Sequence, residues 1–160
     1  MDRLLAIEDI KQLKARYFRF VDSHDWEGFR SLFVDDAVLE SARPSGPGDA
    51  EAWAVMGSFG KKGKIVGVDA IVEFASKGMA AAKSVHTGGM PEITIVTPDS
   101  ARGIWSMEDI VRWPGCTLHG HGYYDETYVR QGGVWLIRSV LLVRKSLKVE
   151  TLATTGGAIV

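Results

Sequence analysis

The spacing of the apolar residues changes near residue 84, and this change constrains the fold more than any other feature. Before that point, residues 3–23 carry one helical stripe, made of Ile7, Ile10, Leu13, Tyr17, Phe20 and Val21. After it, apolar residues alternate and predict strands at 84–97, 100–113, 117–131 and 133–147. Helices followed by long consecutive strands are typical of an α+β fold. We therefore predict a curved antiparallel sheet wrapped around about three N-terminal helices, forming a cone with a pocket inside.

The remaining segments complete this prediction. Asp25 is a candidate cap for a second short helix, VDDAVLE (34–40) is the candidate strand that follows it, and residues 67–82 form a third helix. Gly88-Gly89-Met90-Pro91 predicts a bend within the first of the long strands. Residues 41–66 are loop-rich. Residues 148–160 are expected to be a flexible tail or a contact with another subunit.

Composition narrows the classes of protein. The chain has 160 residues, which fits a single domain spanning 1–160. Its 19 basic and 20 acidic residues give a net charge of -1, so we expect neither a nucleic acid nor a membrane as partner. The N-terminus is charged and does not resemble a secretory signal. With Cys116 as its one cysteine the chain cannot form an internal disulfide, which favours a reducing, cytoplasmic location.

Two acidic residues stand out because they interrupt apolar surfaces. Asp22 follows the run YFRFV at the end of the first helix, where the negative end of the helix dipole disfavours a carboxylate. Asp109 lies on the apolar, aromatic face of strand 101–113, where an unpaired carboxylate is costly. Each is a candidate functional acid. The alternatives are a solvated helix end for Asp22 and an arginine-paired position near the rim for Asp109.

Three other side chains are candidate functional residues if they lie close to those acids. His86 would be a base poised near neutral pH if a carboxylate lies within reach, although a lone histidine is more often structural. Tyr17 lies on the helical stripe, where its ring belongs in the core and its hydroxyl needs a polar partner. Arg144, on the last strand, could bind an anionic group or a buried carboxylate, or could extend into solvent.

No motif for a metal or a nucleotide is present. Cys116, His119 and His121 lie close in sequence, but their spacing matches no zinc motif well. The sequence contains no G-x-S-x-G, no P-loop and no G-x-G-x-x-G. We therefore expect no metal and no cofactor.

Taken together, these residues resemble the SnoaL-like branch of the nuclear transport factor 2-like (NTF2-like) superfamily. The resemblance is carried by four segments: IEDIKQLKARYFRFVDSHDWEGFRSLFVDDAV, HTGGMPEITI, GIWSMEDIVRW and DETYVRQGGVWLI. Within the branch, the chain is most similar to the bacterial bile acid 7α-dehydratases. Their functional tyrosine and aspartate fall on Tyr17 and Asp22, their histidine on His86 and their second aspartate on Asp109. A terminal-strand arginine falls on Arg144.

The resemblance implies a cofactor-independent lyase that removes water from a hydroxylated 3-oxo steroid or a similar polycyclic ketone, either free or as a coenzyme A ester. Tyr17, Asp22, His86 and Asp109 would be catalytic. The substrate-binding residues would be Phe20, Trp105, Met107, Trp113, His121 and Arg144. The alternatives are an isomerase or a polyketide cyclase with the same site, and a non-catalytic module that binds a hydrophobic ligand. Relatives of this kind also imply a homo-oligomer, a trimer.

Overall fold

The computed structural model describes residues 2–42 and 63–151. Helix α1 (Arg3–Ser23) begins at Asp2, whose side chain accepts a hydrogen bond from the Leu4 backbone N–H at 2.9 Å. It ends at His24, which adopts a left-handed conformation with φ of 59°. The predicted helix therefore has the predicted bounds. Its buried residues follow the helical stripe, with one charged addition, Lys14.

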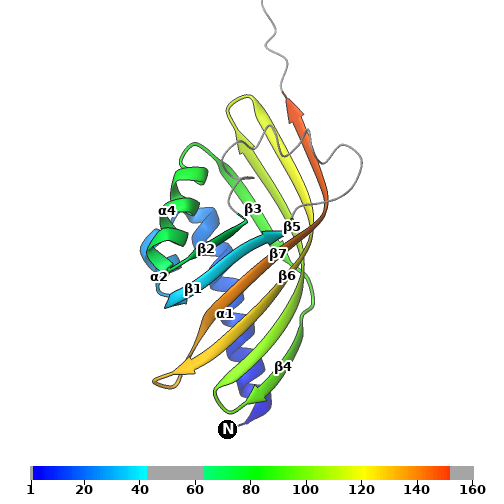
Figure 1. Cartoon of the computed structure of the whole chain (residues 1–160). Helices are drawn as coiled ribbons and strands as arrows, with labels where there is room; N and C mark the ends of the chain where they lie inside the picture. Colours follow the sequence, from blue (N-terminus) through cyan, green and yellow to red (C-terminus); the bar gives the residue numbers. More distant parts are fainter. Residues whose placement is uncertain (1, 43–62, 152–160) are drawn as a thin grey trace, which may run out of the picture.

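The two shorter helices also confirm their sequence signals. Helix α2 (Trp26–Arg30) is capped by Asp25, which accepts a hydrogen bond from Gly28 N–H at 2.8 Å. Helix α4 (Val68–Met79) buries Val68, Ile71 and Met79. Both helices lie at the end of the molecule where α1 terminates (Figure 1).

One seven-stranded sheet contains every described strand. The strands are β1 (Phe33–Ala42), β2 (Lys64–Val66), β3 (Lys83–Gly88), β4 (Glu92–Thr97), β5 (Ser100–Trp113), β6 (Cys116–Gln131) and β7 (Val134–Thr151). Their order is β2-β1-β7-β6-β5-β3, and β4 also pairs with β5. The sheet curves, and α1 crosses one of its faces (Figure 1). The predicted α+β class is confirmed.

The sheet is mixed, which corrects the prediction of a purely antiparallel one. Strand β1 pairs with β7 in parallel, while the other pairs are antiparallel. The reason is topological. Tight turns join β4 to β5, β5 to β6 and β6 to β7 and force these pairs to run antiparallel, whereas β1 and β7 lie far apart in the chain and no hairpin sets their direction.

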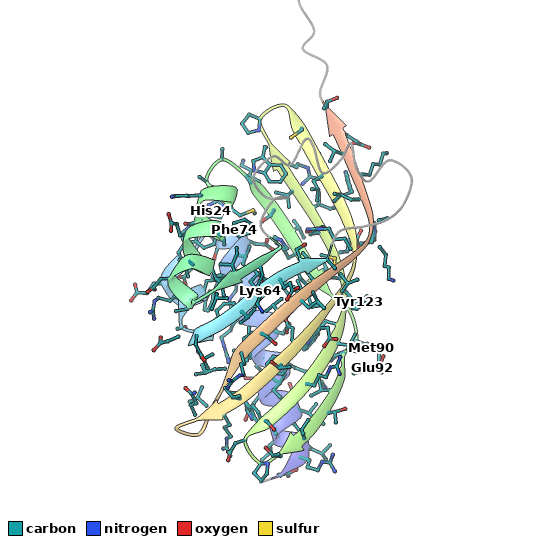
Figure 2. All side chains as sticks on the ribbon, in the orientation of Figure 1. His24, Lys64, Phe74, Met90, Glu92 and Tyr123 are labelled. Carbon is teal, nitrogen blue, oxygen red and sulfur yellow. The ribbon has the colours of Figure 1, made fainter. Side chains whose placement is uncertain are left out.

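The bend predicted at residues 88–91 divides one long segment into β3 and β4. Both strands pair with β5, β3 along residues 107–112 and β4 along residues 100–104. Met90, at the bend, is 95% exposed (Figure 2). The bend therefore lets one strand of the sheet serve two shorter partners, and it fixes the place where β3 meets the end of α1.

The borders of two predicted segments are narrower than the sequence indicates. Residues 41–66 were predicted to be loop-rich, but strand β1 extends to Ala42 and β2 begins at Lys64. The rest of that prediction falls mainly on residues 43–62, which lie outside the described residues. Strand β7 continues to Thr151 and pairs with β6 there, so the predicted tail begins inside a strand. Residues 152–160 lie outside the described residues. Among the described helices, none is long and apolar enough to cross a membrane.

The bulge between β6 and β7 generates a stability prediction. The register shifts between His121 and Gly122, and a Cβ on Gly122 would lie 2.0 Å from the Val143 carbonyl oxygen. We expect Gly122→Ala to lower the free energy of unfolding by about 1–3 kcal/mol, because backbone must move to admit the methyl group. Urea denaturation measures this. Gly63→Ala is the control, since no described atom lies within 4 Å of its Cβ position. Equal urea midpoints for Gly122→Ala and Gly63→Ala would contradict the close approach of the Val143 carbonyl to Gly122.

Candidate active site

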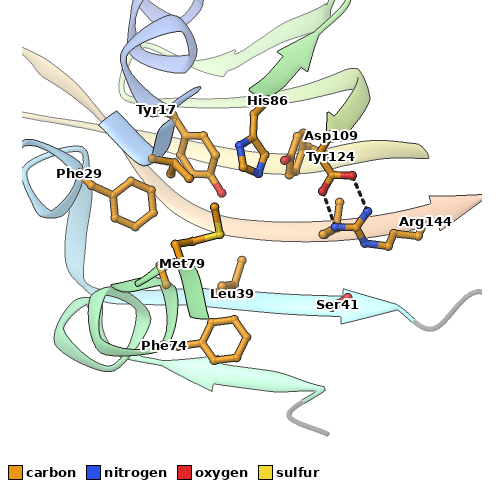
Figure 3. Close-up of a pocket in the computed structure, with 13 residues that line it drawn as sticks. Tyr17, Phe29, Leu39, Ser41, Phe74, Met79, His86, Asp109, Tyr124 and Arg144 are labelled. Atoms are coloured by element: carbon orange, nitrogen blue, oxygen red, sulfur yellow. Dashed lines mark hydrogen bonds and ion pairs between the residues drawn. The ribbon is translucent and has the colours of Figure 1, made fainter. Parts of the chain in front are cut away.

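A cavity of about 130 Å³ lies between helices α1 and α4 and the curved sheet (Figure 3). Most of its lining is apolar or aromatic. It is lined by Tyr17, Val21, Phe29, Leu39, Ser41, Phe74, Ala75, Met79, His86, Asp109, Tyr124, Leu142 and Arg144. Four of the residues singled out in the sequence, Tyr17, His86, Asp109 and Arg144, therefore meet in one place. A concave apolar pocket with a few convergent polar groups is the usual form of a small-molecule site.

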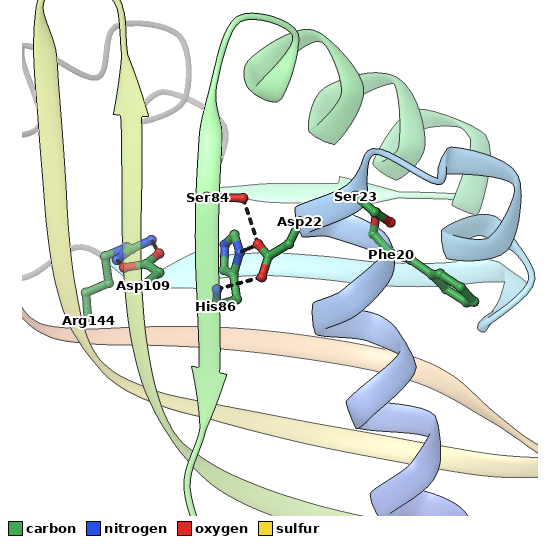
Figure 4. Close-up of polar contacts among 7 residues, drawn as sticks. All are labelled: Phe20, Asp22, Ser23, Ser84, His86, Asp109 and Arg144. Atoms are coloured by element: carbon green, nitrogen blue, oxygen red, sulfur yellow. Dashed lines mark hydrogen bonds and ion pairs between the residues drawn. The ribbon is translucent and has the colours of Figure 1, made fainter.

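Asp22 and His86 form the pair that the sequence could only suggest. Oδ1 of Asp22 lies 2.7 Å from Nδ1 of His86, and Oδ2 accepts a hydrogen bond from the His86 backbone N–H at 2.9 Å (Figure 4). Ser84 Oγ donates to Oδ1 at 2.7 Å. Asp22 does not line the cavity itself. It holds the imidazole from behind, so that Nε2 is the ring nitrogen left for a ligand.

The electrostatics of Asp22 favour its charged form. Burial raises the pKa of this half-buried carboxyl, but the hydrogen bonds from His86 and Ser84 outweigh burial, and the net pKa is lowered. An ionised Asp22 beside Nδ1 is a hydrogen-bond acceptor and selects the tautomer with hydrogen on Nδ1. The solvated-helix-end alternative for Asp22 therefore does not describe this structure.

Asp109 and Arg144 form a buried ion pair in the wall of the cavity. Arg144 Nη1 lies 2.8 Å from Asp109 Oδ1, Nη2 lies 2.5 Å from Oδ2, and Asp109 is 2% exposed. Burial lowers the pKa of Arg144, but the hydrogen bonds and charge of Asp109 reverse the shift and raise it. Gly120 makes room for the pair, because a Cβ there would lie 1.9 Å from Arg144 Nη1. Asp109 is thus both paired with an arginine and part of the pocket, not near the rim.

Tyr17 has a partner that sequence reasoning missed. Tyr124, on β6, also lines the cavity, and the two ring centroids lie 6.0 Å apart. Burial, followed by the charges of Glu126 and Asp109, raises the pKa of Tyr17 above its ordinary value. The pKa of Tyr124 is raised as well, first by burial. Both phenols are therefore neutral hydrogen-bond donors at physiological pH. The signal for Tyr124 was present, since alternation along 117–131 places it on the same face as Leu118 and Tyr128.

The structure places five of the predicted substrate-binding residues away from the described lining. Trp105 and Met107 are buried in the core, where Trp105 Nε1 donates to Tyr128 at 2.8 Å. Trp113 Nε1 donates to the Gly78 carbonyl at 3.0 Å. Phe20 points away from the Asp22–His86 pair (Figure 4). Trp105, Met107 and Trp113 lie on the predicted inner face of β5 without lining the described cavity, because alternation marks the inner face of a strand but does not separate core from cavity.

His121 is the fifth, and it lies on the opposite face of the sheet. Its side chain is 56% exposed, and its Nε2 lies 3.3 Å from Glu108 Oε1. A bulge beside it shifts the register of β6 against β7. His119 points outward with it, toward Glu150. Within residues 2–42 and 63–151, no three histidine, cysteine or acidic side chains gather closely enough to hold a metal ion.

The arrangement is suited to proton transfer at a carbon next to a carbonyl. His86, supported by Asp22, can accept a proton. Tyr17 and Tyr124 can donate hydrogen bonds to an oxygen on which negative charge develops. The Asp109–Arg144 pair adds polar groups to the wall without adding net charge.

A family model described as a SnoaL-like domain matches residues 2–140 of the chain. A protein of Gibberella zeae named "Probable cyclase FGR4" is 26% identical over 147 residues, covering 84% of this chain and 88% of that protein. A hexachlorocyclohexane dehydrochlorinase, LinA-type3 from Novosphingobium barchaimii, superposes with a TM-score of 0.74 at 17% identity, covering 95% of this chain and 93% of that one. A Novosphingobium aromaticivorans protein assigned as a scytalone dehydratase superposes with a TM-score of 0.71 at 18% identity, covering 98% and 97%.

The lowered pKa of Asp22 predicts how stability depends on pH. As the pH falls, the unfolded chain binds this proton first, at its ordinary pKa of 3.8. The stabilising contribution of Asp22 is therefore complete above that pKa and is lost as the pH falls through the lower folded-state value. We expect Asp22→Asn to lower the urea midpoint at neutral pH, and the gap from wild type to shrink below about pH 4. Exposed Asp36→Asn is the control. A gap that stays constant down to pH 2 would contradict this role.

Proposed function

The chain belongs to the SnoaL-like family of the NTF2-like superfamily, and from this we propose that it is a cofactor-independent lyase that eliminates water from a hydroxylated polycyclic ketone of the 3-oxo steroid type. The observation that carries the proposal is the hydrogen-bonded Asp22–His86 pair, with His86 and Tyr17 lining the same apolar cavity. Each step of the proposed reaction requires His86 and Tyr17 to meet the substrate in the same cavity.

In the proposed reaction, Nε2 of His86 removes a proton from a carbon made acidic by the conjugated ketone. Asp22 stabilises the imidazolium that forms. Tyr17 and Tyr124 donate hydrogen bonds to the ketone oxygen as it becomes an enolate. When the enolate collapses, the carbon–oxygen bond to the hydroxyl group breaks, and the proton held by His86 leaves with that oxygen as water. Protons and charge balance without a further reactant.

The Asp109–Arg144 pair defines what the pocket accepts. Both oxygens of Asp109 accept hydrogen bonds from the guanidinium of Arg144, so we assign no proton transfer to Asp109. Arg144 is correspondingly engaged and is unsuited to binding the phosphates of a coenzyme A ester. We therefore assign the pair to positioning the wall of the cavity. A neutral, apolar ring with one carbonyl oxygen fits this lining better than an anionic group.

The size of the cavity indicates how such a ligand lies. An apolar protein cavity of about 150 Å³ accommodates benzene, and the described cavity is of similar size, about 130 Å³. We propose that the ring bearing the ketone occupies this space and that the other rings extend toward its opening. The free acid would then be accepted at least as well as the coenzyme A ester.

The names of the structural neighbours favour elimination over the alternatives. A dehydrochlorinase and a dehydratase both eliminate a small molecule from a carbon skeleton, and both share this fold with the chain. The cyclase is the relative that supports the second candidate, a cyclase or isomerase using the same proton transfer. A module that only binds a ligand has no need of an oriented Asp–His pair, which makes that alternative the weakest.

The direct test is an ultraviolet assay with 7α-hydroxy-3-oxo-4-ene steroids, supplied as free acids and as coenzyme A esters. Elimination extends the conjugation, so we expect a dienone band at longer wavelength with wild type. His86→Ala should lower the rate by roughly 10²–10⁴-fold, the usual contribution of a positioned acid–base group. His121→Ala, on the outer face, is the matched control and should keep the wild-type rate.

Two outcomes would overturn the proposal. If wild type binds these steroids without forming a dienone, the site supports binding or isomerisation rather than elimination. If His86→Ala retains the wild-type rate, the Asp22–His86 pair is not the base.

A further inference from the structure

A second set of charged groups lies within the core beside the pocket, and the proposed reaction does not use it. Lys14 is 0% exposed and donates a hydrogen bond to one oxygen of Glu126, which is also 0% exposed. Tyr128 donates to the other oxygen of Glu126. Trp105 Nε1 in turn donates to the Tyr128 hydroxyl at 2.8 Å. All polar atoms of this chain of contacts therefore have partners.

Stability alone explains such a pair poorly. Two buried charges lose their hydration, and well-packed apolar residues in their place are often as stable or more stable. Burial lowers the pKa of Lys14 below its ordinary value, and the charge and hydrogen bond of Glu126 oppose that shift without reversing it. In the absence of hydration, the contact with Glu126 is the interaction that stabilises a charged Lys14 inside the protein. A buried cation maintained in this way calls for a role beyond filling the core.

The ammonium of Lys14 lies against the two tyrosines that line the pocket. Its Nζ is 3.6 Å from the ring centroid of Tyr124 and 4.0 Å from that of Tyr17. A cation over an aromatic face is attracted to the π electrons and fixes the ring in place. It also draws electron density from a phenol ring, which makes the hydroxyl a stronger hydrogen-bond donor. Lys14 and Tyr17 are three residues apart on α1, so the helix itself sets this contact.

We propose that Lys14 is a positioning residue for the reaction: held by Glu126, its ammonium fixes and polarises the rings of Tyr17 and Tyr124, so that their hydroxyls stabilise negative charge on an oxygen in the pocket. This inference rests on the proposed function, which supplies that oxygen as the enolate. Lys14 acts through the tyrosines and does not itself touch the substrate.

The charge balance around the tyrosines supports the same role. Burial raises the pKa of Tyr17, the charges of Glu126 and Asp109 raise it further, and the charge of Arg144 lowers it. The Lys14 ammonium lies on the faces of both rings, where a positive charge favours negative charge nearby. Removing it leaves the pocket less able to stabilise an anion, even where the fold survives.

The experiment uses 4-nitrophenol, an aromatic ring whose oxygen becomes negative on ionisation and whose absorbance reports that ionisation. The phenol is titrated with pH while bound to wild type, Lys14→Met, Lys14→Met/Glu126→Gln and Trp105→Phe. Trp105→Phe is the matched control, because it disturbs the same buried network and changes no charge. The double variant keeps the net charge of the network and is the one to use if Lys14→Met does not fold.

We expect wild type to lower the pKa of the bound phenol relative to free phenol. Lys14→Met and the double variant should raise that bound pKa by about one unit, a tenfold loss of bound phenolate. Trp105→Phe should leave it at the wild-type value and lower only the thermal midpoint. A purely structural lysine would weaken binding of both forms of the phenol without moving this pKa.

The outcomes separate this inference from the function on which it rests. A wild-type shift that persists in Lys14→Met would overturn the role of Lys14 alone. A bound-phenol pKa that returns to the wild-type value in the double variant would also overturn the role of Lys14. The rise in Lys14→Met would then come from the unpaired Glu126. A wild type that does not bind or ionise the phenol would overturn the inference, whereas the proposed function is decided separately by the dienone assay with wild type and His86→Ala.

Discussion

The site depends on one carboxylate that joins a helix to the edge of a sheet. Asp22, near the C-terminal end of α1, accepts hydrogen bonds from Ser84 and from the backbone and ring of His86 on β3. Because Asp22 binds both the backbone of β3 and the imidazole of His86, it fixes the position of the candidate base relative to the end of α1 and the edge of the sheet. The bend at residues 88–91 makes this possible by ending β3 close to the pocket.

Two buried ion pairs lie around the cavity, and we assign a different role to each. Asp109 and Arg144 form an ion pair in the wall, so that these two groups add no net charge to the surface that would meet an apolar ring. Lys14 and Glu126 lie in the core, with the cation against the faces of the pocket tyrosines. Both pairs occupy positions that alternation or helical spacing marks as apolar. Residue types that violate the pattern therefore coincide with the parts of the molecule that we connect to chemistry.

Sequence patterns predicted the features that depend on residues close together in the chain. The helix of residues 3–23, the bend at 88–91 and the inward face of 101–113 follow from spacing and turn residues. The parallel pairing of β1 with β7 could not be predicted, because no hairpin links them. Alternation placed Trp105 inside but could not tell core from cavity. Lys14 and Glu126 were missed although each interrupts an apolar face, since only the fold shows that they meet across 112 residues.

We infer that Asp22 holds His86 with its proton on Nδ1, which leaves Nε2 as the base in the pocket. The most direct measurement is the tautomer of His86, read by long-range ¹H–¹⁵N NMR of histidine-labelled protein above pH 7, with His86→Gln to assign the signal. We expect a protonated Nδ1 and an unprotonated Nε2 in wild type, and loss of that preference in Asp22→Asn. A wild-type His86 with its proton on Nε2 would contradict it.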